Sequence, residues 1–184
     1  MKKLISVLLI LVIIFSVSAC GKNTSNTDLM LILENKQQFI TEAGEKVYIK
    51  DYKYGEEYYA TPNKYTSVDF DDDGIDELVV DISVNGGIYL VLHSDSSKVY
   101  GFLFSGRELQ SLKTDGSFIQ SGGAIAICYC SMTFGEGTYE ITEIAVSDSY
   151  TGRLEIDGKE CSVEEINEYA KNWQLKEDAE WFEI

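Results

Sequence analysis

The alternation of apolar and polar residues changes twice along this chain, and each change predicts a different kind of segment. An uncharged apolar run covers residues 4–17, the length of the hydrophobic part of an export signal. The next apolar residues fall at helical spacing: Leu29, Ile32, Leu33, Phe39 and Ile40. We therefore expect a first helix over 28–42, which ends before Gly44.

Beyond Gly44 the pattern changes to short β-rich runs separated by turn residues, notably Asn85-Gly86-Gly87, Asp115-Gly116 and Asp157-Gly158. The sequence predicts an antiparallel meander, with 124–134 as a central strand because apolar residues occupy both of its alternating faces. The expected runs are 46–51, 65–70, 77–83, 88–93, 98–104, 110–113 with 117–120, 124–134, 139–147 and 153–156.

The helical pattern returns near the C-terminus. Ser162 and Glu165 have the spacing of a capping box, and apolar residues behind them predict a second helix over 163–172. The aromatic end, 181–184, should add a short strand or pack on the sheet. We expect a single α+β domain over 28–184: an antiparallel β-meander sheet with an N-terminal helix and a C-terminal helix packed on it.

The first twenty residues predict where the protein is sent. Two lysines precede the apolar run, and Val17-Ser18-Ala19-Cys20 ends it with small residues before a cysteine. This tetrapeptide resembles the lipobox of bacterial lipoproteins. The resemblance implies a signal peptide at 1–19, a lipid on Cys20, and attachment to the extracytoplasmic face of the cell membrane, with 20–27 as lipidated cysteine and polar tether. An uncleaved membrane helix is the alternative.

Charge excludes one class of partner. The chain has 31 acidic and 15 basic residues, a net charge of −16, and no basic cluster after the first three residues. Such a surface repels a phosphate backbone, so nucleic acid is not expected as a partner.

The most informative motif is the segment 69–77, which has the pattern D-x-D-x-D-G-x-x-E and six carboxylates in nine residues. The spacing brings hard oxygen ligands around one tight turn, which Gly74 permits, and calcium suits such ligands. The expected ligands are Asp69, Asp71, Asp73, the Ile75 carbonyl and Glu77. An acidic, solvated β-turn is the alternative.

The motif is not an EF-hand, because Val80 stands where an EF-hand carries its last glutamate. It resembles instead the calcium loops of FG-GAP and related β-repeat proteins, although this chain carries one copy, which argues against a complete propeller. The order of lipobox, short helix, DFDDDGIDELVV segment and closing 174–182 segment resembles uncharacterised lipoproteins of low-GC Gram-positive bacteria. That resemblance implies no activity.

Three further groups could carry chemistry. Cys128, Cys130 and Cys161 could be small packed residues, a disulfide with one thiol left over, or a soft-metal site. His93 is the only histidine, and no nucleophile motif accompanies it, so we assign no catalytic residues. Four tyrosines in the dense segment before residue 60 could form a ligand face or simply cover a sheet edge: Tyr52, Tyr54, Tyr58 and Tyr59.

Together these features predict a membrane-anchored, extracytoplasmic lipoprotein with one structural calcium loop, functioning as a binding or interaction module for an envelope glycan or protein. A cell-envelope hydrolase that uses carboxylates is the competing hypothesis, and it would require several acids and an aromatic wall to converge on one cleft.

Overall fold

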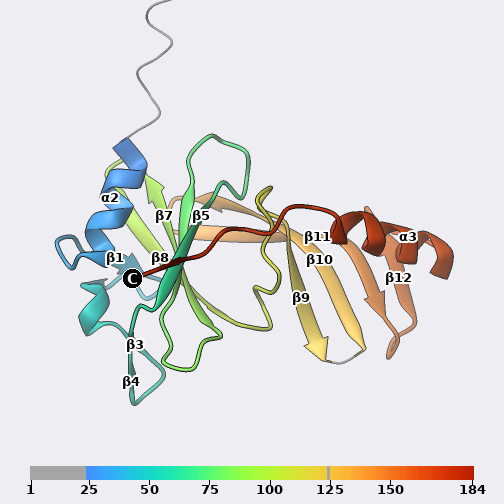
Figure 1. Cartoon of the computed structure of the whole chain (residues 1–184), viewed down its shortest axis with the longest axis horizontal. Helices are drawn as coiled ribbons and strands as arrows, with labels where there is room; N and C mark the ends of the chain where they lie inside the picture. Colours follow the sequence, from blue (N-terminus) through green and yellow to red (C-terminus); the bar gives the residue numbers. More distant parts are fainter. Residues whose placement is uncertain (1–23, 124) are drawn as a thin grey trace, which may run out of the picture.

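The computed structural model describes residues 24–123 and 125–184. The predicted signal peptide and Cys20 lie outside the described residues. A first helix, α2 (Thr24–Leu33), begins the described chain, and a second, α3 (Val163–Gln174), lies near its end. The two helices lie toward opposite ends of the long axis of the molecule (Figure 1).

A seven-stranded sheet forms around an antiparallel meander of β5, β6, β7 and β8. The strand order is β14-β5-β6-β7-β8-β1-β2, and β1 pairs with β8 in parallel. The bounds are β1 (Phe39–Thr41), β2 (Lys46–Val47), β5 (Lys64–Val68), β6 (Glu77–Asp81), β7 (Ile88–Asp95), β8 (Lys98–Ser105) and β14 (Phe182–Glu183).

A second sheet of five strands follows as a continuous antiparallel meander, in the order β13-β12-β11-β10-β9. Its bounds are β9 (Phe118–Gly123), β10 (Ala126–Gly135), β11 (Thr138–Asp148), β12 (Arg153–Ile156) and β13 (Lys159–Glu160). A short 3-10 helix, η1 (Ile49–Asp51), and a separate two-stranded hairpin, β3 (Lys53–Tyr54) with β4 (Tyr58–Tyr59), complete the described elements.

Three hydrophobic clusters hold these layers together. One cluster joins the two sheets and contains residues of both, among them Phe70, Val79, Phe102, Phe118 and Met132. A second lies between α2 and the other face of the seven-stranded sheet, with Leu29, Ile32, Leu78, Val80 and Leu90 as members. A third packs α3 on the second sheet through Tyr129, Ala145, Ile166 and Trp173. The seven-stranded sheet is thus covered on both faces.

Because the seven-stranded sheet is covered on both faces, all five residues of strand β6 are buried. Leu78 and Val80 face α2, whereas Val79 faces the second sheet. By the alternation of side chains along a strand, Glu77 and Asp81 share the face of Val79. Two carboxylates therefore lie on the covered inner face of the sheet. In the other sheet β10 pairs on both sides, with β9 and β11, but it is second from the edge and β11 is central; Ile127 on β10 is 38% exposed.

The prediction of a first helix over 28–42 was wrong at its C-terminal end. The helix stops at Leu33, Asn35 takes a left-handed backbone with φ of 56°, and Phe39 begins strand β1. Phe39 is fully buried, and its ring fills the space beside Gly101 on β8, where a Cβ would meet it at 2.5 Å. Pairing with β8 therefore overrides the helical spacing. At the other end, the helix begins at Thr24 and not at residue 28.

The expectation of one sheet carrying both helices also needs correction. α2 packs on the seven-stranded sheet and α3 on the five-stranded one, so each helix covers a different sheet. The coarser prediction holds: the chain is mostly antiparallel β-structure with two helices, broadly compatible with an α+β class. The capping box at Ser162 and Glu165 is confirmed, and the aromatic end adds β14 beside β5. Within 24–123 and 125–184, no helix is long and apolar enough to cross a bilayer.

Candidate metal site

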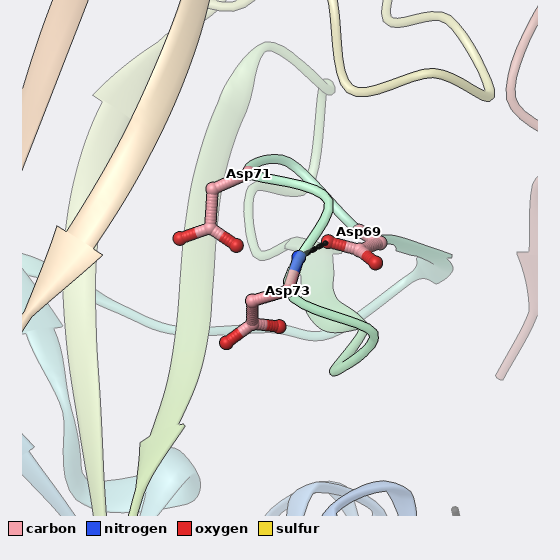
Figure 2. Close-up of side chains that lie close together, drawn as sticks. All are labelled: Asp69, Asp71 and Asp73. Atoms are coloured by element: carbon pink, nitrogen blue, oxygen red, sulfur yellow. Dashed lines mark hydrogen bonds between the residues drawn. The ribbon is translucent and has the colours of Figure 1, made fainter.

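The loop between β5 and β6 brings three of the predicted ligands together. One carboxylate oxygen from each of Asp69, Asp71 and Asp73 lies within 4.8 Å of the other two (Figure 2). Two oxygens that bind one calcium ion at about 2.3 to 2.6 Å can be at most about 5 Å apart. The spacing of the three oxygens therefore fits one shared ion.

The loop backbone is held by its own side chains. Asp69 accepts hydrogen bonds from the Asp73 amide at 3.2 Å and the Gly74 amide at 2.8 Å, the first of which is drawn in Figure 2. Asp73 in turn accepts from the Ile75 amide at 2.7 Å. Gly74 has φ of 84°, a left-handed conformation that glycine adopts without strain. Asp72, which the motif leaves outside the ligand set, is exposed.

Asp71 extends from this loop to the second sheet. Its Oδ2 accepts a hydrogen bond from the Phe134 amide of β10 at 3.2 Å. Its Oδ1 is buried and has no hydrogen-bond partner among the described residues, the one such side-chain atom found there. A buried carboxylate oxygen without a partner is costly, so either a hydrogen-bond donor or a cation would be stabilising at this position.

Glu77 is not part of this group of three in the structure. Its side chain is fully buried, its Oε2 accepts from the Phe70 amide at 3.1 Å, and its Oε1 lies 2.9 Å from Nδ1 of His93. Burial raises the pKa of Glu77, and the bonds to His93 and Phe70 oppose that rise. Both oxygens of Glu77 thus have protein partners. Ligation by Glu77, like ligation by the Ile75 carbonyl, stays a prediction.

His93 connects the two sheets beside the loop. It lies on β7, is buried, with 6% of the residue exposed, and stacks on Phe134 of β10 with ring centroids 4.7 Å apart and planes 8° apart. Phe134 therefore contacts β7 through its ring, which stacks on His93, and the β5–β6 loop through its amide, which donates to Asp71. The carboxylate loop, the Glu77–His93 pair and β10 form one connected structure at the sheet junction.

The turn at Gly116 packs closely against the backbone of this loop. A Cβ on Gly116 would lie 2.6 Å from Cα of Phe70 and 2.8 Å from the carbonyl oxygen of Asp69, and Gly116 has φ of 76°. The adjacent Ser117 hydroxyl accepts from Nε1 of Trp173 at 3.1 Å, which ties this turn to α3. Only glycine allows the turn to approach the loop backbone this closely.

The predicted tyrosine face divides into two parts. Tyr52 is half-buried and meets Phe39 edge-on at 5.2 Å, and Tyr54 is half-buried and stacks on Tyr58 at 5.8 Å. Tyr58 and Tyr59, on β4, are 62% and 54% exposed, and the Lys53 ammonium lies 4.7 Å from the Tyr59 ring. Tyr52 and Tyr54 pack on the α2-side cluster, so only Tyr58 and Tyr59 remain largely available to a ligand.

A hollow of about 420 Å³ lies beside this hairpin. Its lining includes Tyr52, Lys53 and three acids, Glu42, Glu45 and Asp51. The Asp69–Asp73 carboxylates do not line it. The acidic residues that line this hollow are therefore not those of the 69–77 loop.

The thiols are also separated. Cys128 and Cys130 lie together on β10 with their sulfur atoms 3.1 Å apart, whereas Cys161 packs against the α3 cluster. All three are free thiols in the structure. Among the described residues the three do not form a metal-binding group, since the only such group found there is the Asp69–Asp71–Asp73 set.

Comparison with family models, curated proteins and solved structures gave no match. The resemblance to uncharacterised lipoproteins therefore stays an expectation. Sequence reasoning missed two residues of the junction, His93 and Gly116. For His93 a signal existed: it lies two residues beyond buried Val91 on a β-run, which places it on the inner face. For Gly116 the Asp-Gly turn was recognised, but nothing local showed what it would contact.

Proposed function

We propose that residues 69–77 bind one calcium ion, and that this ion has a structural role: it fixes the β5–β6 loop against β10 and so joins the two sheets. The observation that carries the proposal is the buried, unpartnered Oδ1 of Asp71 within a group of three converging carboxylates. A cation at that position gives Oδ1 the partner that it lacks.

Charge supports a cation at this place. Three carboxylates within 4.8 Å repel one another, and no Lys or Arg of the described residues forms an ion pair with Asp69, Asp71 or Asp73. A bound divalent ion removes that repulsion. Calcium fits better than magnesium because it accepts many oxygen ligands in flexible geometry, whereas magnesium requires a near-octahedral site and retains waters.

The test is a comparison of melting temperatures in calcium, magnesium and chelator. Single loops on extracellular modules bind calcium at about 10⁻⁴ to 10⁻³ M. About 1 mM calcium should then stabilise the folded state by about 0.4 to 1.4 kcal/mol, and raise the melting temperature by about 1 to 5 °C. Asp71→Ala should remove the calcium increment, and Asp72→Ala should keep it. Equal melting temperatures in calcium, magnesium and chelator would overturn the proposal.

For the whole protein we propose a lipid-anchored lipoprotein of the extracytoplasmic membrane face, attached through Cys20, that acts as a binding or interaction module. The support for anchoring is the sequence Val17-Ser18-Ala19-Cys20. Mass spectrometry of the protein from its native membrane should find an acylated N-terminal peptide that begins at Cys20, and Cys20→Ser should abolish acylation. Recovery of an unmodified Cys20 would contradict anchoring.

The support for a binding module is the exposure of Tyr58 and Tyr59 on a hairpin outside both large sheets. Replacing both with Ala should reduce retention on isolated cell-wall glycan or on an envelope protein. The matched control is Tyr150→Ala, which removes an exposed tyrosine, 86% exposed, at a distant turn. Equal retention of the two variants and the wild type would argue against this face.

A further inference from the structure

Two cysteines on β10 form a close pair at the edge of the core between the sheets. Cys130 is completely buried in that core, and Cys128 is half-buried and packs against it. Their sulfur atoms are 3.1 Å apart. A disulfide has an S–S distance of about 2.05 Å, so a shift of about 1 Å would bring the two sulfurs to bonding distance.

The backbone at this point is irregular. Tyr129 pairs with Ala145 of β11, but the next residue, Cys130, pairs with Glu143, so Ile144 is skipped. Such a bulge increases the local twist, and bulges are common beside functional sites. The pair therefore lies where the register of β10 and β11 changes.

One of the two thiols is accessible from outside. Cys128 lines an open hollow of about 230 Å³ together with Gln120, Glu143 and Arg153. Cys130 has no exposed surface. An external reagent can therefore reach Cys128 first, and Cys130 only through Cys128.

The two thiols also influence each other's protonation. Their hydrogen bond lowers the pKa of Cys130, an effect that burial opposes, and raises the pKa of Cys128. Attack by Cys128 therefore requires its proton to pass to Cys130, across the 3.1 Å that separates the two sulfurs. Cys161 differs, because burial and the nearby carboxylates of Glu165 and Glu155 raise its pKa.

We propose that Cys128 and Cys130 are a redox-active pair that closes to an intrastrand disulfide by exchange with an external disulfide. The Cys128 thiolate attacks the external disulfide RSSR, forms a mixed disulfide with one RS group, and expels the other as thiolate. The Cys130 sulfur then attacks Cys128, forms the intrastrand bond, and expels the second RS group. The two protons of the pair pass to the two leaving thiolates, so one disulfide is consumed and two RSH are released.

Such a bond should be easily reversed. It closes a ring across one intervening residue of a strand, and strained or exposed disulfides are the labile ones. The pair is thus suited to sense or relay the thiol–disulfide state of its surroundings, and a bond that only staples the fold would resist reduction. This proposal is independent of calcium, because the pair and the carboxylate loop share no residue.

The test uses the full-length protein and oxidised glutathione as RSSR, at graded ratios to reduced glutathione. Free thiols are alkylated and the protein is digested with trypsin. The sequence provides an internal readout, because Cys128 and Cys130 fall in one tryptic peptide, 114–153, and Cys161 falls in another, 160–171. We expect peptide 114–153 to change from doubly alkylated to unalkylated and two hydrogens lighter, and to return on reduction. Peptide 160–171 should show only alkylation or a glutathione adduct.

Variants separate the two roles. In Cys130→Ala the mixed disulfide of Cys128 with glutathione should persist. The wild type should lose this mixed disulfide at least tenfold faster than the variant. Cys128→Ser should make Cys130 react with glutathione disulfide at least tenfold more slowly than Cys128 does in the wild type. Cys161→Ser, the matched control, should leave the conversion of peptide 114–153 unchanged.

Because Cys130 is buried, the Cys130→Ala variant could misfold. The mass of peptide 114–153 from the wild type tests the proposal without that variant. A two-hydrogen loss in peptide 114–153 that reverses on reduction supports the proposal. Two alkylated cysteines at every ratio, a persistent glutathione adduct in the wild type, or a bridge from Cys128 to Cys161 would each overturn it.

Discussion

The acidic loop, residues 69–77, and the tyrosine hairpin, residues 52–59, are both dense clusters of one kind of side chain, but the fold uses them differently. The loop lies at the junction of the sheets, where Asp71 contacts β10 and Glu77 contacts His93. The hairpin forms a sheet of its own, with Tyr58 and Tyr59 exposed. Composition alone does not distinguish the two. The difference is that the loop contacts strands of both large sheets, whereas the hairpin pairs only with itself.

The largest difference between the two regions should come from buried polar groups. Glu77→Ala removes the partners of the Phe70 amide and of His93 in a buried site, and each unsatisfied group costs about 1 to 3 kcal/mol. We expect the free energy of unfolding, measured by urea denaturation in chelator, to fall by about 2 to 5 kcal/mol. The matched change on the hairpin, Glu56→Ala, removes an exposed carboxylate and should cost less than about 0.5 kcal/mol. Similar decreases in the free energy of unfolding for the two variants would contradict the claim that buried polar contacts at the junction stabilise the fold.

Two glycines provide the next comparison. Gly116→Ala places a Cβ against the backbone of Phe70 and Asp69 and also requires a left-handed alanine, so we expect a loss of about 2 to 4 kcal/mol. Gly55→Ala on the hairpin has φ of 74° but no atom within 4 Å of the added Cβ. Its cost should be limited to the left-handed conformation, about 1 to 2 kcal/mol. Thermal melts of both variants measure the difference, and a Gly55→Ala loss as large as that of Gly116→Ala would contradict the close contact.

The tyrosines should show the smallest effects on stability. Tyr52→Ala removes a half-buried ring that packs on Phe39, and should cost about 1 to 2 kcal/mol. The double change Tyr58→Ala and Tyr59→Ala removes exposed rings and should cost less than about 1 kcal/mol in the same melts. A large loss for the double variant would mean that β4 supports the fold and is not a free face.

The comparison also shows how much the sequence could predict. Local signals located most strands, the Ser162 capping box and the carboxylates of the loop, because turn residues and alternation act over a few neighbours. Strand β1 was misassigned because Ile40 and Thr41 pair in parallel with β8, about 60 positions away, and no local pattern encodes that pairing. Glu77 fitted the ligand spacing, yet its partner His93 comes from another strand. Cys128 and Cys130 share a face because side chains alternate along a strand, which is a local signal, whereas the register change with β11 beside them has none.

The central claim is that an ion in the acidic loop joins the two sheets, and hydrogen exchange in calcium against chelator tests it most directly. Calcium should slow exchange of the amides at 69–77 and also of the Phe134 amide, which belongs to β10 and donates to Asp71. Exchange in the hairpin, 52–59, should not change, because its strands pair with each other and its inner rings pack on the α2-side cluster. Asp71→Ala should abolish the calcium effect at Phe134. Equal exchange in calcium and chelator at both the loop and Phe134 would contradict the account.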